Sequence, residues 1–381
     1  MRDKNRFLGC LLGGAVGDAL GYPVEFMREP EIFDRYGARG ITRYKLHNGK
    51  ALISDDTQMT LFTAVGLLIG KTRGMMRGIG GVHRDYIRMA YLDWLDTQTR
   101  IYPCKSEHFR VSWLANFEEF YHRRAPGKTC MTALLNGGNG TIEAPANNSK
   151  GCGGVMRVAP IGLYLCDDGY WSKSEIDMLG AEAAAITHGH ELGYIPAAAL
   201  VHLIHAVASG EQTDLASAAA EAVDAMPALF PEAKEMPRFV SLMRQAIELS
   251  QKDMDDLAAV LTLGRGWVAE ETLAIAVYCA LKYADDFEKA VITAVNHGGD
   301  SDSTGAVTGS ILGAYLGVDA IPAFYLKDLE LKDFIEEIAE DLYNDCQMEE
   351  YGSYRDPLWI SKYIHMDYDA QTRKKLREVS E

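Results

Sequence analysis

The chain gathers two carboxylates, Asp300 and Asp302, and two hydroxyls, Ser303 and Thr304, directly after the glycine pair at 298–299. An apolar segment with helical periodicity follows, so these side chains lie at the start of a predicted helix. One acid suffices to cap a helix, whereas two ionised carboxylates in a poorly solvated site need a cation or hydrogen-bond donors to offset their repulsion. Because Mg²⁺ and Mn²⁺ prefer carboxylate, hydroxyl and water oxygens, the stretch indicates either a metal site or a helix cap with incidental acids.

A second acid cluster occurs much earlier, where Asp55 and Asp56 are flanked by the hydroxyls of Ser54 and Thr57. It also precedes an apolar run, which predicts a helix that ends at Gly70. The helix dipole favours negative charge at both clusters, and together they could hold one or two metal ions. Two independent helix caps are the weaker interpretation, because the same combination of acids and hydroxyls occurs twice.

Two further features could do chemistry, and each also has an ordinary structural explanation. Glu25 follows a glycine-spaced apolar helix predicted between Arg6 and Pro23, and an acid on such a loop is more often a solvated surface group. The glycine-rich loop at 144–154 could hold a phosphate with its backbone amides. That loop matches neither the dinucleotide fingerprint nor the P-loop, and a plain connection is the more common role of such a loop.

Two histidines, His188 and His190, follow a helix predicted over 174–186. No Cys or HExxH partner of a zinc site accompanies them. We therefore favour a cationic cap at the negative end of that helix, with some allowance for ligand contact by His188.

The elements that must position these residues are helices. Apolar periodicity predicts further helices over 82–97, 128–135, 195–208, 215–225, 237–249, 267–283, 287–296 and 329–343. Residues 28–53 predict a long ordered loop, and 74–81 a flexible turn. The small residues of 305–317 would let another element approach their backbone closely. Strand-like alternation is almost absent, so the fold class is all-α. We expect one domain over 1–343, and over 344–381 an aromatic and then basic, frayed extension packed on it.

Net charge and cysteine content indicate which classes of partner and which compartment suit the protein. The 381 residues carry a net charge of −16, which argues against a nucleic acid or an anionic membrane as partner. The seven cysteines are scattered, without a CxxC pair, and predict reduced thiols in a cytoplasmic protein. No apolar run reaches transmembrane length. The sequence sets no oligomeric state.

Five motifs in order resemble the ADP-ribosylglycohydrolase family. They are residues 9–21 with Glu25, residues 54–57, residues 151–160, residues 187–188 and residues 298–303. The resemblance implies a single all-helical domain with two Mg²⁺ or Mn²⁺ ions at the base of an acidic cleft. The implied metal ligands are Ser54, Asp55, Asp56, Asp300, Asp302 and Ser303. The family often has Thr in place of Ser54 and Ser303, and Asn in place of Cys152.

The same resemblance implies the remaining roles. Glu25 would be the acid/base group, and the metals would accept the hydroxyls of the distal ribose. The loop formed by Gly151, Cys152, Gly153 and Gly154 would hold the diphosphate, and His188 would help to position ADP-ribose. We expect hydrolysis of the bond between ADP-ribose and a modified protein side chain, with arginine as the first candidate. The alternatives are a serine linkage, O-acetyl-ADP-ribose as a small conjugate, a non-catalytic ADP-ribose binder, or a phosphatase that cuts the diphosphate and releases AMP.

Overall fold

The structure is a computed structural model that describes residues 2–78, 83–167, 169–348 and 356–380. Within these residues it is built from helices, and its strands form one short hairpin, β1 (Leu46–His47) and β2 (Lys50–Ala51). The helices are α1 (Lys4–Gly21), α2 (Glu29–Tyr36), α3 (Asp55–Arg77), α4 (His83–Thr99), α5 (Lys128–Leu135), α6 (Ala159–Tyr164), α7 (Lys173–Ala185), α8 (Glu191–Ser209), α9 (Leu215–Leu229), α10 (Met236–Ser250), α11 (Asp256–Leu263), α12 (Ala269–Lys282), α13 (Phe287–Val295), α14 (Ser301–Leu316), α15 (Ala323–Lys327), α16 (Lys332–Asn344), α17 (Pro357–Ile360) and α18 (Ala370–Ser380). The predicted all-α class is confirmed.

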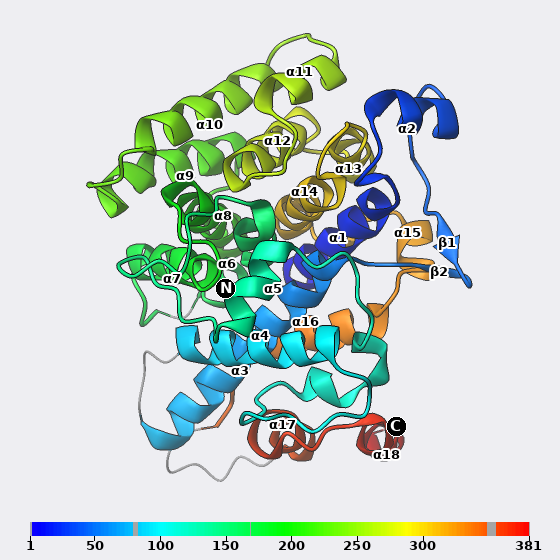
Figure 1. The fold of residues 1–381 in the computed structure, drawn as a ribbon, viewed down its shortest axis with the longest axis vertical. Coiled ribbons are helices and arrows are strands. Elements are labelled where there is room, and N and C mark those ends of the chain that lie inside the picture. Colours follow the sequence, from blue (N-terminus) through cyan, green and yellow to red (C-terminus); the bar gives the residue numbers. More distant parts are fainter. Residues whose placement is uncertain (1, 79–82, 168, 349–355, 381) are drawn as a thin grey trace.

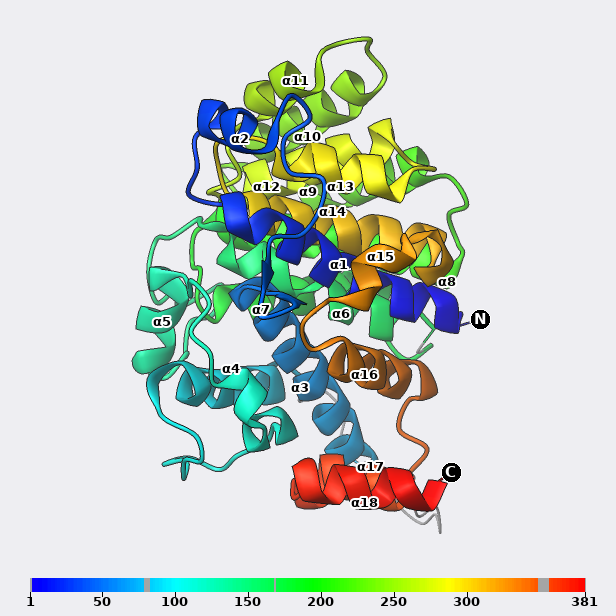
Figure 2. The same cartoon turned by 90° about the vertical axis from the view of Figure 1, so that its right-hand side faces the viewer.

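Helices α1 and α14 lie side by side through the middle of the molecule (Figure 1). Helices α10 to α13 lie towards one end, and α3, α4, α17 and α18 lie towards the other (Figure 2). The first turns of α3 and α14 carry the two acid clusters predicted from the sequence. The central helix pair therefore fixes where those clusters meet.

Glycines set the spacing of α1 and α14. A Cβ at Gly13 would lie 2.3 Å from the carbonyl oxygen of Gly309, and one at Gly17 would lie 2.0 Å from that of Gly305. The same opposition recurs at Gly9 with Gly313 and at Gly21 with Ser301. The order of these pairs shows that the helices are antiparallel, so the end of α1 lies beside the start of α14. The close approach predicted from the small residues of 305–317 is confirmed.

Gly309→Ala is expected to lower the free energy of unfolding by about 1–3 kcal/mol or more. The added methyl would meet the backbone of Gly13, which cannot rotate away as a side chain can. Urea denaturation followed by circular dichroism would measure the loss as a lower midpoint. Gly70→Ala on α3 is the matched control, because its Cβ would have its nearest neighbour at an ordinary 3.4 Å. Equal stabilities of the two variants would contradict the close contact of α1 with α14.

The helix end predicted at Gly70 was wrong, because a glycine can mark a close contact between helices as well as a helix end. Helix α3 continues past Gly70 to Arg77, because Gly66 and Gly70 face α4 and a Cβ at Gly66 would lie 2.7 Å from Cα of Ile87. The helix ends instead at Gly78, whose φ is 63°. Of the turn predicted over 74–81, residues 79–81 lie outside the described residues, as does Val82, the predicted start of the next helix.

The segment predicted as one long loop, 28–53, contains α2 and the β1–β2 hairpin. Helix α2 is short and buries only Ile32, so its periodicity in the sequence is too brief to recognise. Helix α11 was also missed; it is an eight-residue helix capped by the Asp255 side chain. The other predicted helices are present, with ends that differ by a few residues.

The C-terminal extension contacts α3 and α16 rather than fraying. Its Lys362 is buried, and Nζ lies 2.7 Å from Asp341 Oδ2 and 2.9 Å from Glu337 Oε1. Trp359 Nε1 donates to Thr72 Oγ1 at 3.1 Å. The basic tail forms α18, where the Arg373 guanidinium pairs with Glu337 at 2.8 Å. The domain boundary at residue 343 stays a prediction.

Two helices have the length and composition of a membrane span, although none was expected from the sequence. They are Lys4–Val24, which contains α1, and α8. In the structure, 83% and 94% of their apolar windows are buried inside the protein. Their apolar character is that of core helices, since both pack on all sides against other helices of the chain.

Candidate functional site

A cavity of about 350 Å³ opens where the end of α1 meets the first turns of α3 and α14. Its wall also includes the start of α5, the 3-10 turn Cys152–Arg157 and the loop before α12. The lining residues are Glu25, Phe26, Asp55, Asp56, Ala125, Pro126, Gly127, Lys128, Thr129, Cys130, Gly151, Cys152, Gly153, Met156, His188, Trp267, Asp300, Asp302 and Ser303. All five carboxylates predicted from the sequence as site residues therefore share one cavity.

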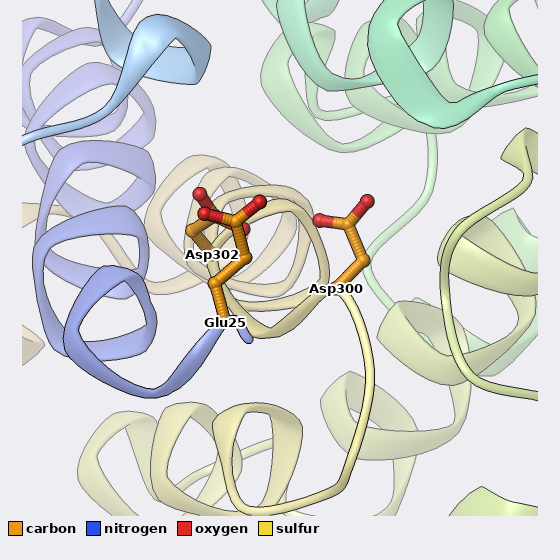
Figure 3. A group of neighbouring side chains, drawn as sticks. All are labelled: Glu25, Asp300 and Asp302. Atoms are coloured by element: carbon orange, nitrogen blue, oxygen red, sulfur yellow. The ribbon is translucent and has the colours of Figure 1, made fainter. Parts of the chain in front are cut away.

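Three of these acids converge most closely. Glu25, Asp300 and Asp302 each offer a carboxylate oxygen, and the three oxygens lie within 4.8 Å of one another. Figure 3 shows Glu25 extending from the loop after α1 toward Asp302, with Asp300 just before the first residue of α14. Glu25 is only 7% exposed, so the interpretation of this residue as a solvated surface acid was wrong.

Burial and mutual repulsion raise the pKa values of the cluster. Burial, followed by the charges of Asp302, Asp300 and Asp55, raises the pKa of Glu25 to about 11. Burial and neighbouring acids raise the pKa of Asp302 to about 7. Burial is also the main cause that raises the pKa values of Asp55, Asp56 and Asp300. A positively charged partner in the cavity would stabilise the ionised form of these carboxylates.

The acids fit a divalent cation in a second respect. Glu25 Oε2 and Asp56 Oδ2 are buried and have no hydrogen-bond partner among the residues that the structure describes. Buried carboxylate oxygens without donors are costly unless a cation binds them. Hard cations such as Mg²⁺ and Mn²⁺ take carboxylate oxygens as ligands, so the donor set suits them. Among the described residues, this is the single group of three acids, histidines or cysteines whose ligand atoms converge.

A buried acid that sequence reasoning missed holds the first turn of α3 in place. Asp18 on α1 accepts hydrogen bonds from the backbone amides of Ser54 at 2.9 Å and Thr57 at 3.1 Å, and from the Thr57 hydroxyl. Burial raises its pKa to about 6, although these hydrogen bonds oppose the shift. The available signal was a charged residue at a core position of an apolar helix. Asp18 thus ties α1 to the helix that presents Asp55 and Asp56.

The two predicted serine ligands differ in position. Ser303 lines the cavity, and its Oγ lies 3.9 Å from Met156 Sδ. Ser54 is fully buried and does not line it; its Oγ accepts the amide of Asp56 at 3.1 Å and caps α3. Ser54 is therefore a helix cap in the structure. The role of Ser54 as a metal ligand stays a prediction.

The predicted phosphate loop reaches the cavity with three of its four residues: Gly151, Cys152 and Gly153 line it, whereas Gly154 does not. A Cβ at Gly153 would lie 2.8 Å from His188 Cε1. The loop and the histidine therefore approach each other as only glycine allows.

His188 is not the cationic helix cap that we favoured from the sequence. It is buried and lines the cavity, and its Nδ1 lies 2.8 Å from Thr187 Oγ1. Burial, and then the charge of Arg157, lowers its pKa to about 3, so the ring is neutral at neutral pH. His190 instead caps the start of α8, where Nδ1 accepts the amide of Leu192 at 3.0 Å.

Several lining residues were missed from the sequence, among them Lys128, Phe26 and Trp267. Lys128 lies in the first turn of α5, beside Gly127, whose amide donates to Asp55 Oδ2 at 3.3 Å. Phe26 and Trp267 are 74% and 42% exposed, and their rings stack with centroids 5.9 Å apart. Single residues on loops carry no periodic signal, so only the folded chain reveals their shared position.

The fold and this site define an all-helical protein in which acids from three distant segments converge on one cavity. The family model described as ADP-ribosylglycohydrolase matches residues 1–352. The ADP-ribosyl-[dinitrogen reductase] glycohydrolase of Rhodospirillum rubrum is 28% identical over 337 residues, which cover 86% of this chain and 91% of that protein. The ADP-ribosylhydrolase ARH3 of Mus musculus is 28% identical over 390 residues, which cover 91% of this chain and 93% of that protein.

A solved structure described as an ADP-ribosylglycohydrolase-related protein complex aligns with a TM-score of 0.54 and 25% identity, covering 90% of this chain and 98% of that one. The chain belongs to the ADP-ribosylglycohydrolase family. It is a hydrolase that acts on glycosyl bonds.

Proposed function

We propose that this chain removes ADP-ribose from a modified protein side chain, with arginine as the preferred linkage, and that it depends on two Mg²⁺ or Mn²⁺ ions. The observation that carries the proposal is the convergence of Glu25, Asp300 and Asp302 in a cavity whose wall includes a glycine-rich loop. A non-catalytic ADP-ribose binder would have no use for repelling acids that remain in the site. The similarity to the ADP-ribosyl-[dinitrogen reductase] glycohydrolase of Rhodospirillum rubrum supports the same function.

Asp55, Asp56, Asp300, Asp302 and Ser303 would hold the ions. When bound, the ions would orient the hydroxyls of the distal ribose and offset the charge of the acids. The protein supports this arrangement with Asp18, which keeps the first turn of α3 fixed. The two helix N-termini add a favourable field for the acids themselves.

Glu25 would carry the proton transfer. Burial raises the pKa of its carboxyl, which favours the protonated form that could protonate the departing side chain. After departure, the same carboxylate can accept a proton from the attacking water. The loop after α1 brings the Glu25 carboxylate together with those of Asp300 and Asp302, so a ribose held at these acids would lie beside it.

The remaining wall suits the rest of ADP-ribose. The amides of the loop at 151–153, with the ammonium group of Lys128, would bind the diphosphate. The exposed rings of Phe26 and Trp267 offer a flat apolar surface to the adenine base. His188, being neutral, would position the ligand by hydrogen bonding rather than by charge.

We also propose a cytoplasmic location. All seven cysteines are free in the structure, as is usual for a reducing compartment.

Matched arginine- and serine-ADP-ribosylated proteins, incubated with the enzyme in Mg²⁺ and then in Mn²⁺, are expected to release ADP-ribose from arginine first. The physical reason is attraction of the cationic guanidinium by an acidic cleft, which salt screens beyond about 10 Å. Mass spectrometry of the products would measure the release, and O-acetyl-ADP-ribose would be a third substrate. Release from serine alone would overturn the arginine assignment. Release of AMP would overturn glycosidic cleavage, and binding without any release would identify an ADP-ribose binder.

A further inference from the structure

A fully buried arginine lies close to His188, although it does not itself line the cavity. Arg157 Nη2 donates to Thr187 Oγ1 at 2.7 Å and to the carbonyl oxygen of Ala183 at 3.1 Å. The guanidinium also lies over the ring of Tyr91, with Cζ 4.3 Å from the ring centroid. These contacts hold the positive charge in one place, against the hydroxyl of the residue that precedes His188.

The Thr187 hydroxyl links this guanidinium to the imidazole of His188. A guanidinium only donates hydrogen bonds, so Thr187 Oγ1 accepts from Arg157 and has its own proton left to donate. Two acceptors are near: His188 Nδ1 at 2.8 Å and the carbonyl oxygen of Ala184 at 3.5 Å. Because 3.5 Å exceeds the usual length of an O–H···O bond, the proton goes to Nδ1. The positive charge favours the same direction, since it attracts the lone pair of Nδ1 and repels an N–H there.

The other ring nitrogen of His188, Nε2, faces the glycine-rich loop. A Cβ at Gly151 or at Gly153 would lie 3.3 Å from Nε2. Burial, and then the charge of Arg157, lowers the pKa of His188 to about 3, so the ring carries a single proton at neutral pH. If Nδ1 accepts a hydrogen bond, that proton is on Nε2. Within the part of the chain that the structure describes, Nε2 has no hydrogen-bond partner, so its N–H is left for a ligand in the cavity.

We propose that Arg157 and Thr187 are positioning residues that keep the proton of His188 on Nε2, so that the ring donates a hydrogen bond to an oxygen of the ligand that can only accept. The oxygens of a diphosphate are of this kind, and the loop beside Nε2 is the segment whose amides would bind them. With the proton on Nδ1, Nε2 would present a lone pair to a negative charge and repel it. The inference rests on the proposed function only in taking ADP-ribose as the ligand.

The local fold connects the loop with the histidine. The 3-10 turn Cys152–Arg157 supplies loop residues to the cavity wall at its start and the buried arginine at its end. One short segment therefore provides backbone amides for an anion and also sets the donor on the neighbouring ring.

Nitrogen NMR of histidine-labelled protein would identify the protonated ring nitrogen, because protonated and unprotonated ring nitrogens have well-separated chemical shifts. The His188 signals are those missing from His188→Ala. We expect the wild type and Thr187→Ser to carry the proton on Nε2 and to show a hydrogen-bonded Nδ1. Thr187→Val should lose the shift that this hydrogen bond gives to Nδ1. The measurement needs no ligand, and a proton on Nδ1 in the wild type would overturn the inference.

Calorimetry of ADP-ribose binding in Mg²⁺ tests whether Thr187 acts through His188. Thr187→Val is expected to weaken binding by roughly 10-fold or more, the range for a hydrogen bond to a charged group, and Thr187→Ser should restore it. In a His188→Ala background, Thr187→Val should have no further effect, because the residue through which it acts is gone. Thr72→Val is the matched control. Thr72 is equally buried, donates to the carbonyl oxygen of Leu68 at 2.7 Å and does not line the cavity.

An equal loss of affinity on Thr187→Val in both backgrounds would show a purely structural role and overturn the inference. Unchanged binding in Thr187→Val, or no ADP-ribose binding by the wild type, would overturn it as well. Circular dichroism would check that each variant folds. Hydrolysis is scored separately on the wild type: release of ADP-ribose together with additive effects removes this inference alone. The expected NMR and binding results without release of ADP-ribose remove the proposed hydrolysis alone.

Discussion

Glu25→Gln is expected to lower the turnover of an ADP-ribosylated substrate by roughly 10²- to 10⁴-fold, the range lost with a general acid/base group. Glutamine keeps a carbonyl oxygen and the size of the side chain, but it can neither donate the carboxyl proton nor accept one from water. The structure makes this variant informative, because Glu25 is buried and packed against Asp302 and Asp300, so a polar isostere should keep its place.

The measurement is single-turnover release of ADP-ribose, with ADP-ribose binding followed by calorimetry. Binding should remain while turnover falls, which separates a chemical role from a structural one. Glu31→Gln is the control. The Glu31 carboxylate accepts the backbone amide of Arg28 at the start of α2, and it does not line the cavity. Wild-type turnover in Glu25→Gln would show that another group transfers the proton.

Asp302→Asn is expected to abolish both Mn²⁺ binding and hydrolysis. Asp302 lies in the first turn of α14 and contributes to the converging group of oxygens. An amide provides at most one neutral oxygen, so the cavity loses both a negative charge and a ligand. Without metal, the variant should be slightly more stable than the wild type, because repulsion among the acids is relieved.

Electron paramagnetic resonance of free Mn²⁺ would measure the binding, and thermal unfolding in a chelator would measure the stability. The control is Asp177→Asn, a buried aspartate that pairs with His202 at 2.8 Å outside the cavity. Undiminished Mn²⁺ binding in Asp302→Asn would refute the assignment of this acid as a ligand. If the control also lost Mn²⁺ binding, the loss would come from a disturbed fold and not from the missing ligand.

The sequence predicts best where one local pattern has one physical cause. The acid clusters at 54–57 and 300–303 combine charge, hydroxyls and a following apolar run, and the structure places both at helix starts. The small residues of 305–317 predict a close neighbour, and α1 occupies that position. Such inferences need no knowledge of which distant segment supplies the partner.

Prediction fails where the cause lies in another part of the chain. Gly70 reads as a helix end, but it faces α4. His188 reads as a cap, but burial beside Arg157 keeps it neutral. Asp18 was given no role from the sequence, yet it holds the turn that presents Asp55. Each depends on a contact between segments that periodicity does not encode.

The glycine contacts of α1 with α14 also restrict how this protein can evolve. No amino acid is smaller than glycine, so every substitution at Gly13 or Gly309 adds at least a methyl group against a carbonyl oxygen. Any substitution at these two positions is therefore expected to destabilise the protein. Phe26 and Trp267 on their loops bear no such restriction, since their side chains are 74% and 42% exposed. Substitutions on those loops can therefore change what the cavity binds, whereas a substitution in the contact of α1 with α14 would also disturb the spacing between Glu25 and the acids of α14.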